Sequence, residues 1–470
     1  MSDTDLCYIP AHEALKRFRD RSLSPVELMR AVIARAEAVE PGLIAFTHRR
    51  FDEAMDKARA AEAHYAAGRP RPLEGLPLAV KDEQEIKGQP STSGSLLYRD
   101  NIAQSTSPSI ARLLRAGAIV HARTVTPEFC CVGVTHSRLW GVSRNPWNRD
   151  YDVGGSSGGS ASALAAGMTT LANGTDYAGS IRIPASCCGV VGYKPPYGRN
   201  PELPPFNLDP YNHIGPMARS VADCALMQNV MCGPHAADHA TVRPKLRIPA
   251  ALGDIKGWRI GWSMDLGYFA IDAAVRANTL AALDAFRAAG AEVVEVALPW
   301  TLDVRTAFQN HLEMIFGAWI GQALDRHRDL LTDYARTVGE RARAASPARL
   351  MASMEVEGQM AIDFDQALRG CDVLVCPTLA IPAMTAGFGC FDPDFEVDGV
   401  KVDSYLQWCM TYPFNMLNRC PVLSLPSGVA PSGVPTGIQI VGRPFDDVRA
   451  FRAAAAFERA MPWAGRRPSL

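Results

Sequence analysis

A lysine and two serines stand in surroundings that could support nucleophilic catalysis. Lys81 ends the apolar run at residues 76–80, where a cation has no packing role. A buried lysine loses its charge readily, because burial disfavours the ammonium form. Ser156 lies in VGGSSGGSAS, residues 153–162, and Ser180 lies in DYAGSIRIPAS, residues 176–186. A serine hydroxyl becomes an effective nucleophile when a base takes its proton.

The glycine-rich segment 153–162 admits three interpretations. A phosphate-binding loop is one, but the segment has no G-x-x-x-x-G-K-[ST] pattern, no G-x-G-x-x-G opening a helix, and no Lys or Arg. A flexible linker is the second, and the apolar segment ASALAAGM that follows at once argues against it. The third is a catalytic loop, in which glycines let backbone and small hydroxyls approach a reacting centre.

Ser180 is the candidate nucleophile, with an ordinary turn or capping serine as the competing interpretation. The following segment IRIPAS places Pro184 where it suits a first helical turn. Backbone N–H groups at such a turn could converge on one point. They would then form an oxyanion hole, with added positive potential from the helix start.

Two kinds of base could serve Ser180. His136 and His213 are the nearest histidines in sequence, so a Ser-His-Asp triad is possible. Lys81 is the other candidate, against the alternative that it is an ordinary lysine paired with Asp82 or Glu83. The residue pattern alone leaves both alternatives open.

These motifs resemble the amidase signature family of serine hydrolases. Lys81, GGSSGGS at 154–160 and DYAGSIRIPAS at 176–186 carry the resemblance. It extends over roughly residues 24–461 through TPEF (126–129), RNPWN (144–148), GYKP (192–195), GPMARSV (215–221), CPT (376–378) and GIQIVGRPF (437–445). It implies a Ser-cisSer-Lys triad, in which Ser180 is acylated, Ser156 bridges from a cis peptide bond, and Lys81 is the base.

The resemblance also assigns the residues around the nucleophile. It implies an oxyanion hole formed by the backbone N–H groups of Tyr177, Ala178, Gly179 and Ser180. It implies that Thr175, Asp176 and Arg182 support this turn, Arg182 through a buried ion pair. The family most often has two glycines before the nucleophile, whereas here Ala178 precedes Gly179. The methyl group of Ala178 restricts its backbone to negative φ more than glycine would.

The Ala-Gly-Ser pattern resembles a branch that includes nylon-oligomer cyclic-dimer hydrolases and enzymes that cleave aryl amides and urethanes. The expected function is therefore amidase activity on amide C–N bonds, including aryl amides and carbamates. One alternative is the amidase subunit of a tRNA-dependent amidotransferase. Another, from a different class, is a nucleotide-binding protein that uses the glycine-rich loop.

The segment YGRNPELPPFNLDPYNH, residues 197–213, is rich in Pro and aromatic residues and is expected to form a loop over the pocket. The helical block 304–323 adds further aromatic side chains, with ordinary core packing as the alternative. The candidate pocket residues are Tyr197, Arg199, Phe206, Tyr211 and Phe316.

Composition excludes several classes of protein. The 470 residues are 47% apolar, and 48 Lys and Arg balance 49 Asp and Glu. This gives no electrostatic footprint for nucleic acid or an anionic membrane. No signal peptide or spanning segment is evident, so a cytoplasmic protein is expected. The 12 cysteines contain no CxxC, which favours buried thiols over a zinc site. We expect no metal or cofactor, a small amide or carbamate as the partner, and a monomer or homodimer.

Helical and strand-like segments alternate along the chain, which predicts an α/β fold. The family resemblance implies one large domain with a central twisted mixed sheet flanked by helices. Residues 1–70 are expected to form helices that pack on a catalytic domain at 71–470. The first strong helix begins at a capping box formed by Ser24 and Glu27, with Pro25 between them. A loop is expected at 232–257.

Overall fold

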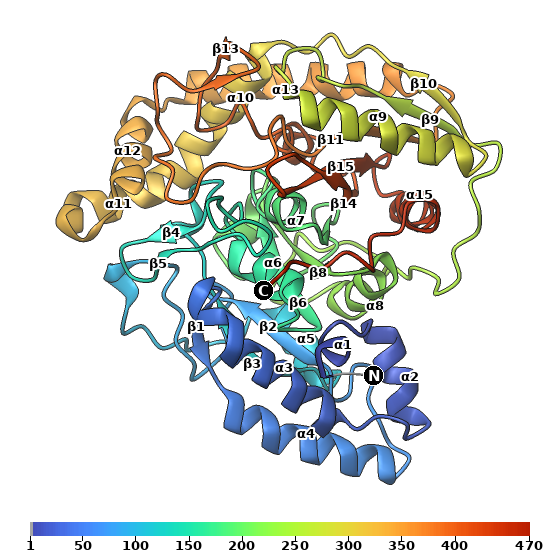
Figure 1. Ribbon diagram of the computed structural model, residues 1–470. Helices are drawn as coiled ribbons and strands as arrows, with labels where there is room; N and C mark the ends of the chain where they lie inside the picture. The colour runs from blue at the N-terminus through green and yellow to red at the C-terminus, as the bar shows by residue number, and fades with distance from the viewer. Residues whose placement is uncertain (1–2) are drawn as a thin grey trace.

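The computed structural model describes residues 3–470, in which eleven strands share one central sheet (Figure 1). The strands are β1 (Phe46–Arg49), β2 (Pro77–Lys81), β3 (Ile119–Thr124), β6 (Leu171–Asp176), β7 (Val191–Lys194), β8 (His213–Ala218), β9 (Arg259–Trp262), β10 (Glu292–Glu295), β11 (Val373–Pro377), β14 (Val422–Val429) and β15 (Pro435–Val441). Their order across the sheet is β1-β3-β2-β6-β8-β7-β14-β15-β11-β9-β10.

The sheet is mixed, as predicted. β2 is parallel to β3 and β6, and β9 is parallel to β10 and β11. Between these two parallel groups, the strands β8, β7, β14 and β15 run antiparallel to their neighbours. The edge strand β1 pairs antiparallel with β3, so residues 1–70 contribute a strand as well as the expected helices.

Helices surround this sheet, with α1–α4 at the bottom of the view and α10 and α13 at the top (Figure 1). Their bounds are α1 (Asp3–Cys7), α2 (Ala11–Arg19), α3 (Pro25–Val39), α4 (Phe51–Ala66), α5 (Pro108–Arg115), α6 (Gly158–Ala165), α7 (Arg182–Cys188), α8 (Val221–Met231), α9 (Ala273–Ala288), α10 (Leu302–Leu312), α11 (Ala318–His327), α12 (Asp333–Arg341), α13 (Pro347–Ala367), α14 (Pro413–Met416) and α15 (Asp447–Ala460). A π-helical turn, Glu313–Gly317, joins α10 to α11. Two small hairpins pair β4 (His136–Ser137) with β5 (Gly141–Val142) and β12 (Glu396–Val397) with β13 (Val400–Lys401).

The predicted capping box is present at the start of α3. Ser24 Oγ accepts from the backbone N–H of Val26 at 3.0 Å, and Glu27 accepts from the Ser24 N–H at 2.8 Å. Between α8 and β9 the chain forms no helix or strand, in agreement with the loop expected at 232–257.

Alternation along β2 directs Lys81 toward the catalytic side of the sheet. Leu78 and Val80 pack in one apolar cluster, whereas Ala79 packs on the opposite face against Leu164 of α6. Successive strand residues point to opposite faces, so Lys81 shares the face of Ala79. The lysine therefore points toward the glycine-rich segment that leads into α6.

Two further expectations concern the whole chain. Across residues 3–470, no helix combines the length and the apolar character that a membrane span requires. All twelve cysteines are free thiols, and Cys130 is the one that is partly exposed rather than buried.

Candidate active site

Lys81 is completely buried beneath the glycine-rich segment. Its Nζ lies 2.8 Å from Ser156 Oγ and 2.7 Å from Thr175 Oγ1, and it donates to both. Glu83 Oε1 lies 3.4 Å from the same nitrogen. The main chain of Lys81 is also held, because its N–H donates to Asn173 Oδ1 at 3.0 Å. The ammonium group is thus directed at Ser156.

The glycine-rich segment is tightly packed rather than loose. Residues 152–160 are all buried, and the peptide bond between Gly155 and Ser156 is cis, as the resemblance implies. A Cβ on Gly155 would overlap the backbone of Val134, so the close approach requires glycine. Ser157 N–H donates to Ser180 O at 3.1 Å, which ties the segment to the turn that carries Ser180.

Ser180 lies in the turn between β6 and α7 and is 7% exposed. Gly179 has φ of 126°, and a Cβ there would overlap the side chain of Thr411. Ala178 does not have positive φ, and its carbonyl accepts from Thr411 Oγ1 at 2.5 Å. The Ala-Gly order therefore introduces no backbone strain, because the glycine occupies the position that needs it.

The N–H groups of residues 177–180 are available to a ligand. Within the described chain none of them donates to a carbonyl or a side chain, although the next N–H, of Ile181, donates to Asp176 Oδ2 at 3.2 Å. Backbone donors left unpaired at such a turn can stabilise an oxyanion. Ser180 and this set of donors share one turn.

A buried ion pair braces the turn. Arg182 and Asp176 are both fully buried, with Arg182 Nη2 2.8 Å from Asp176 Oδ1. Burial alone would raise the pKa of Asp176, but the Arg182 guanidinium and a hydrogen bond from Asn415 bring that pKa well below its usual range. The remaining Arg182 donors reach Thr411 O and Gln439 Oε1. This predicted support is therefore present.

Ser156, Thr175 and Ser180 line a cavity of about 450 Å³. Part of its wall is aromatic and is called here the aromatic wall, formed by Phe129, Tyr177, Phe206, Phe316 and Trp319. Its rings pack on one another, since Phe316 lies 5.3 Å from both Tyr177 and Phe206 between ring centroids. A second part of the lining carries Glu83, Gln84, Glu85 and Glu202.

Of the five predicted pocket residues, Phe206 and Phe316 line this cavity and three do not. Tyr197 donates to Asn207 O at 2.6 Å, and Arg199 forms an ion pair with Asp447 at 2.8 Å. Tyr211 is fully buried, with its ring stacked on His311 at 3.9 Å. Each of the three is occupied by contacts within the protein, so their assignment to the pocket is wrong.

The histidine alternatives for the base are also placed by the structure. His213 is buried, and burial with the nearby Lys194 lowers its pKa to about 3. Neither His213 nor His136 lines the cavity, and among the described residues no His, Lys or Arg does. Lys81 lies behind the lining and reaches the cavity through Ser156.

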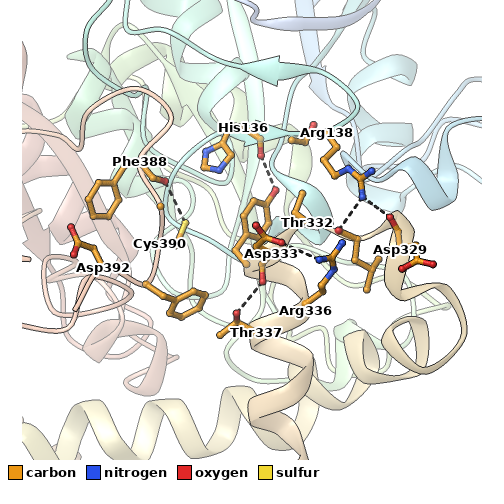
Figure 2. Close-up of a pocket in the computed structure, with 15 residues that line it drawn as sticks. His136, Arg138, Asp329, Thr332, Asp333, Arg336, Thr337, Phe388, Cys390 and Asp392 are labelled. Carbon is orange, nitrogen blue, oxygen red and sulfur yellow. Dashed lines mark hydrogen bonds and ion pairs between the residues drawn. The ribbon is translucent and has the colours of Figure 1, made fainter. Parts of the chain in front are cut away.

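A larger cavity, about 900 Å³, lies elsewhere and contains none of the three candidate residues (Figure 2). Its lining includes His136, Arg138, Asp333 and Arg336. These charges are largely paired within the wall, because Arg336 binds Asp333 at 3.1 Å and Arg138 donates to Asp329 O at 2.6 Å. Size alone therefore does not identify the reactive site.

Sequence reasoning missed several polar residues of the lining. Gln84, Glu85, Cys130 and Glu202 are among those that reach the cavity but had not been assigned to it. Three of these positions carried a usable signal, since Gln84 and Glu85 follow Lys81 closely and Glu202 lies in the Pro-rich segment 197–213. In the described residues, no group of three or more His, Cys, Asp or Glu side chains is arranged to hold a metal ion.

Comparison with known sequences gives extended matches. The model of the amidase family matches residues 27–451. The chain is 34% identical to an acylamidase of Rhodococcus erythropolis, over 100% of this chain and 99% of that protein. It is 32% identical to one of the subunits of the glutamyl-tRNA(Gln) amidotransferase of Geobacter metallireducens, over 98% of both chains.

Solved structures agree with the sequence matches. A bacterial aryl acylamidase of the amidase signature enzymes superposes with a TM-score of 0.91 at 30% identity, covering 98% of this chain and 99% of that one. A 6-aminohexanoate cyclic dimer hydrolase, solved with its substrate, gives 0.87 at 28% identity, with 98% and 99% covered.

Proposed function

This chain belongs to the amidase family, hydrolases that act on amide C–N bonds, and we propose that it cleaves aryl amides and aryl carbamates through an acyl-enzyme on Ser180. The observation that carries the substrate class is the aromatic wall beside Ser180. Aromatic rings pack favourably on one another in offset and edge-to-face arrangements. A flat aryl group on either side of the scissile bond would find such partners here.

In the proposed reaction, Ser180 Oγ attacks the carbonyl carbon of the substrate. Its proton passes to Ser156 Oγ, while Ser156 gives its own proton to a neutral Lys81 Nζ. The N–H groups of residues 177–180 stabilise the oxyanion. When the C–N bond breaks, Ser156 returns a proton to the departing amine and is reprotonated by Lys81. Water then attacks the acyl-enzyme through the same relay.

The short contact between Lys81 and Ser156 supports this relay. The lysine is completely buried and lies 2.8 Å from the Ser156 hydroxyl, which lines the cavity together with Ser180. Proton transfer requires heavy atoms within hydrogen-bond reach. An amide and a carbamate both present a carbonyl bonded to nitrogen, so one relay serves both substrates.

The amidotransferase alternative receives less support from the cavity. Free glutamine carries an α-carboxylate, which proteins usually bind with Arg or Lys. Among the described lining residues there is no cationic side chain, and three carboxylates are present instead. The nucleotide-binding alternative loses its basis too, because the glycine-rich segment is buried against the protein and not open to a phosphate.

The test combines active-site labelling with turnover. The purified protein would be treated with an aryl sulfonyl fluoride, and the adduct located by peptide mass spectrometry. Release of aniline from acetanilide and from phenyl N-phenylcarbamate would be followed in parallel. We expect modification of Ser180 with loss of both activities, and Ser180→Ala as the unlabelled, inactive control. Aniline release by Ser180→Ala at the wild-type rate would overturn the proposal. Glutaminase activity without any anilide hydrolysis would favour the amidotransferase alternative.

A further inference from the structure

One side of the active-site cavity offers only hydrogen-bond acceptors and negative charge to a ligand. We call it the acceptor wall, formed by the side chains of Glu83, Gln84, Glu85 and Glu202. It belongs to the same cavity as Ser180 and the aromatic wall. A substrate that occupies the cavity therefore meets both surfaces.

Two acceptor atoms of this wall have no partner in the described chain. Gln84 is only 6% exposed, and its Oε1 is buried without a hydrogen bond. Its amide cannot simply turn over, because Nε2 donates to Glu202 Oε1 at 3.0 Å. Glu83 Oε2 is likewise buried and unpartnered, although Oε1 accepts from Thr175. A buried acceptor without a donor is costly, which makes a donor on the ligand favourable.

The cations nearest to the wall do not neutralise it from within the cavity. Lys81 donates to Ser156 and Thr175. Arg123 is buried behind the wall and donates to the backbone carbonyls of Pro90 and Asp82, at 3.1 Å and 2.9 Å. Neither cation lines the cavity.

The acidic groups keep a negative potential at this wall at alkaline pH. Burial, with the charge of Glu83 nearby, raises the pKa of Glu202 to about 7, so its carboxylate is ionised at pH 8.5. Glu85 is partly exposed and contacts the hydroxyl of Ser105. No lining residue supplies the opposite charge among those described.

We infer that the acceptor wall binds a protonated amine on the substrate, so that the preferred substrates are aryl amides carrying a cationic aminoalkyl group and those carrying a carboxylate are disfavoured. The inference rests on the proposed function, because it assigns the substrate class of the same site. The aromatic wall reinforces this preference, since ring faces attract cations. A cavity of about 450 Å³ is in the range that holds a ring with a short side arm.

Three acetanilides that differ only in the 4-substituent provide the kinetic test: 4-aminomethyl (cationic), 4-methyl (neutral) and 4-carboxy (anionic). kcat/KM would be measured for each at pH 8.5 and low salt. We expect the cationic compound to exceed the neutral one about tenfold, and the neutral one to exceed the anionic one about tenfold, as one charge interaction of moderate strength gives. Sodium chloride at 0.5 M should reduce both ratios.

The variants are compared by the ratio of cationic to neutral substrate, which is independent of the fraction of folded enzyme. Glu202→Gln and the double variant with Glu85→Gln should lower this ratio progressively toward one. Glu37→Gln, on the exposed side of α3, is the matched control and should keep the wild-type ratio. Equal kcat/KM for all three substrates in the wild type, or a ratio unaffected by the double variant, would overturn the inference.

A binding measurement separates failure of the inference from failure of the proposed function. Ser180→Ala would be titrated by calorimetry with 4-methylbenzylamine and with 4-methylbenzoate. We expect the amine to bind at least about tenfold more tightly, whether or not the wild type hydrolyses anilides. Equal or reversed affinities would contradict the acceptor wall. Absent hydrolysis together with tight amine binding would instead reject only the proposed reaction.

Discussion

Lys81 Nζ lies 2.8 Å from Ser156 Oγ, and the Ser156 hydroxyl is the group through which this buried lysine reaches the cavity. The lysine itself is absent from the cavity lining, whereas Ser156 and Ser180 both belong to it. A proton from Ser180 would therefore reach the lysine by way of Ser156. The geometry makes the roles of the two residues separately testable.

Replacement of Lys81 by Met or Arg should abolish the proton acceptor in both variants. Met has no basic nitrogen, and Arg stays protonated at every accessible pH. We expect kcat/KM on an anilide to fall by about 10³-fold or more in each. Activity in Lys81→Arg near the wild-type value would show that a fixed positive charge, not a base, is needed.

Ser156→Ala should lower kcat by about 10²-fold to 10³-fold, because the path between Ser180 and Lys81 is interrupted. The matched control is Ser157→Ala, the next hydroxyl along the chain, which is also buried and contacts the backbone of Thr175 at 3.3 Å. That control should lose less than about tenfold. Stopped-flow measurement of acylation and deacylation would show both steps slowed in Ser156→Ala. Equal rates in the two variants would remove Ser156 from the relay.

The spacing of motifs predicted the centre of the site better than its rim. Lys81 and Ser156 come into hydrogen-bond contact because β2 ends where the glycine-rich segment passes. The turn at Ser180 follows from the small residues before it and from Gly179. These features depend on local backbone requirements, which a sequence displays directly.

The rim depended on which way loop side chains point, which composition does not display. Within segment 197–213, Phe206 faces the cavity, while Tyr211 turns into the core against His311. The central strands were hidden for another reason. β8 contains Gly215 and Pro216, and β14 contains Pro426, so their residues do not follow ordinary strand preferences. Tertiary contacts with neighbouring strands decide these segments.

Gly179→Ala should reduce both stability and activity. Its φ of 126° is unfavourable for alanine, and the added methyl would overlap Thr411, whose hydroxyl holds the carbonyl of Ala178. We expect a loss of about 2–4 kcal/mol in the free energy of unfolding and at least about 10²-fold in kcat. Ala178→Gly is the control and should stay within about 1 kcal/mol and tenfold. Wild-type activity in Gly179→Ala would show that the turn is not positioned by this glycine.

Asp176→Asn should destabilise the protein by about 3–5 kcal/mol, because it leaves the Arg182 guanidinium buried without its counter-charge. The lowered pKa of Asp176 also fixes the pH dependence. Its stabilisation is present above the unfolded-state pKa and is lost as pH falls below it, so wild type and variant should converge in acid. Urea unfolding at pH 4 and pH 7 measures the difference. Asp325→Asn, in an exposed pair with Arg343, is the control and should shift the midpoint little at either pH.

Glu202→Gln should make stability less dependent on pH, because burial and the charge of Glu83 raise the pKa of Glu202 to about 7. The folded state holds this proton more tightly than the unfolded chain, so the contribution to stability is greatest below pH 4.5 and declines as pH rises through 7. The decline corresponds to about 3 kcal/mol. Gln84 and Asn212 both donate to Glu202, so the Gln variant also loses one acceptor at every pH.

The readout for Glu202→Gln is therefore the change with pH in the difference from wild type, measured by urea unfolding between pH 5 and pH 8.5. The variant should gain relative to wild type as pH increases, while Glu37→Gln on the exposed side of α3 should show a constant difference. A difference for Glu202→Gln that stays flat across this range would mean that its carboxyl group ionises in the folded protein as it does in water. The acceptor wall would then be better hydrated than its burial implies, and a weaker preference for cationic substrates would follow.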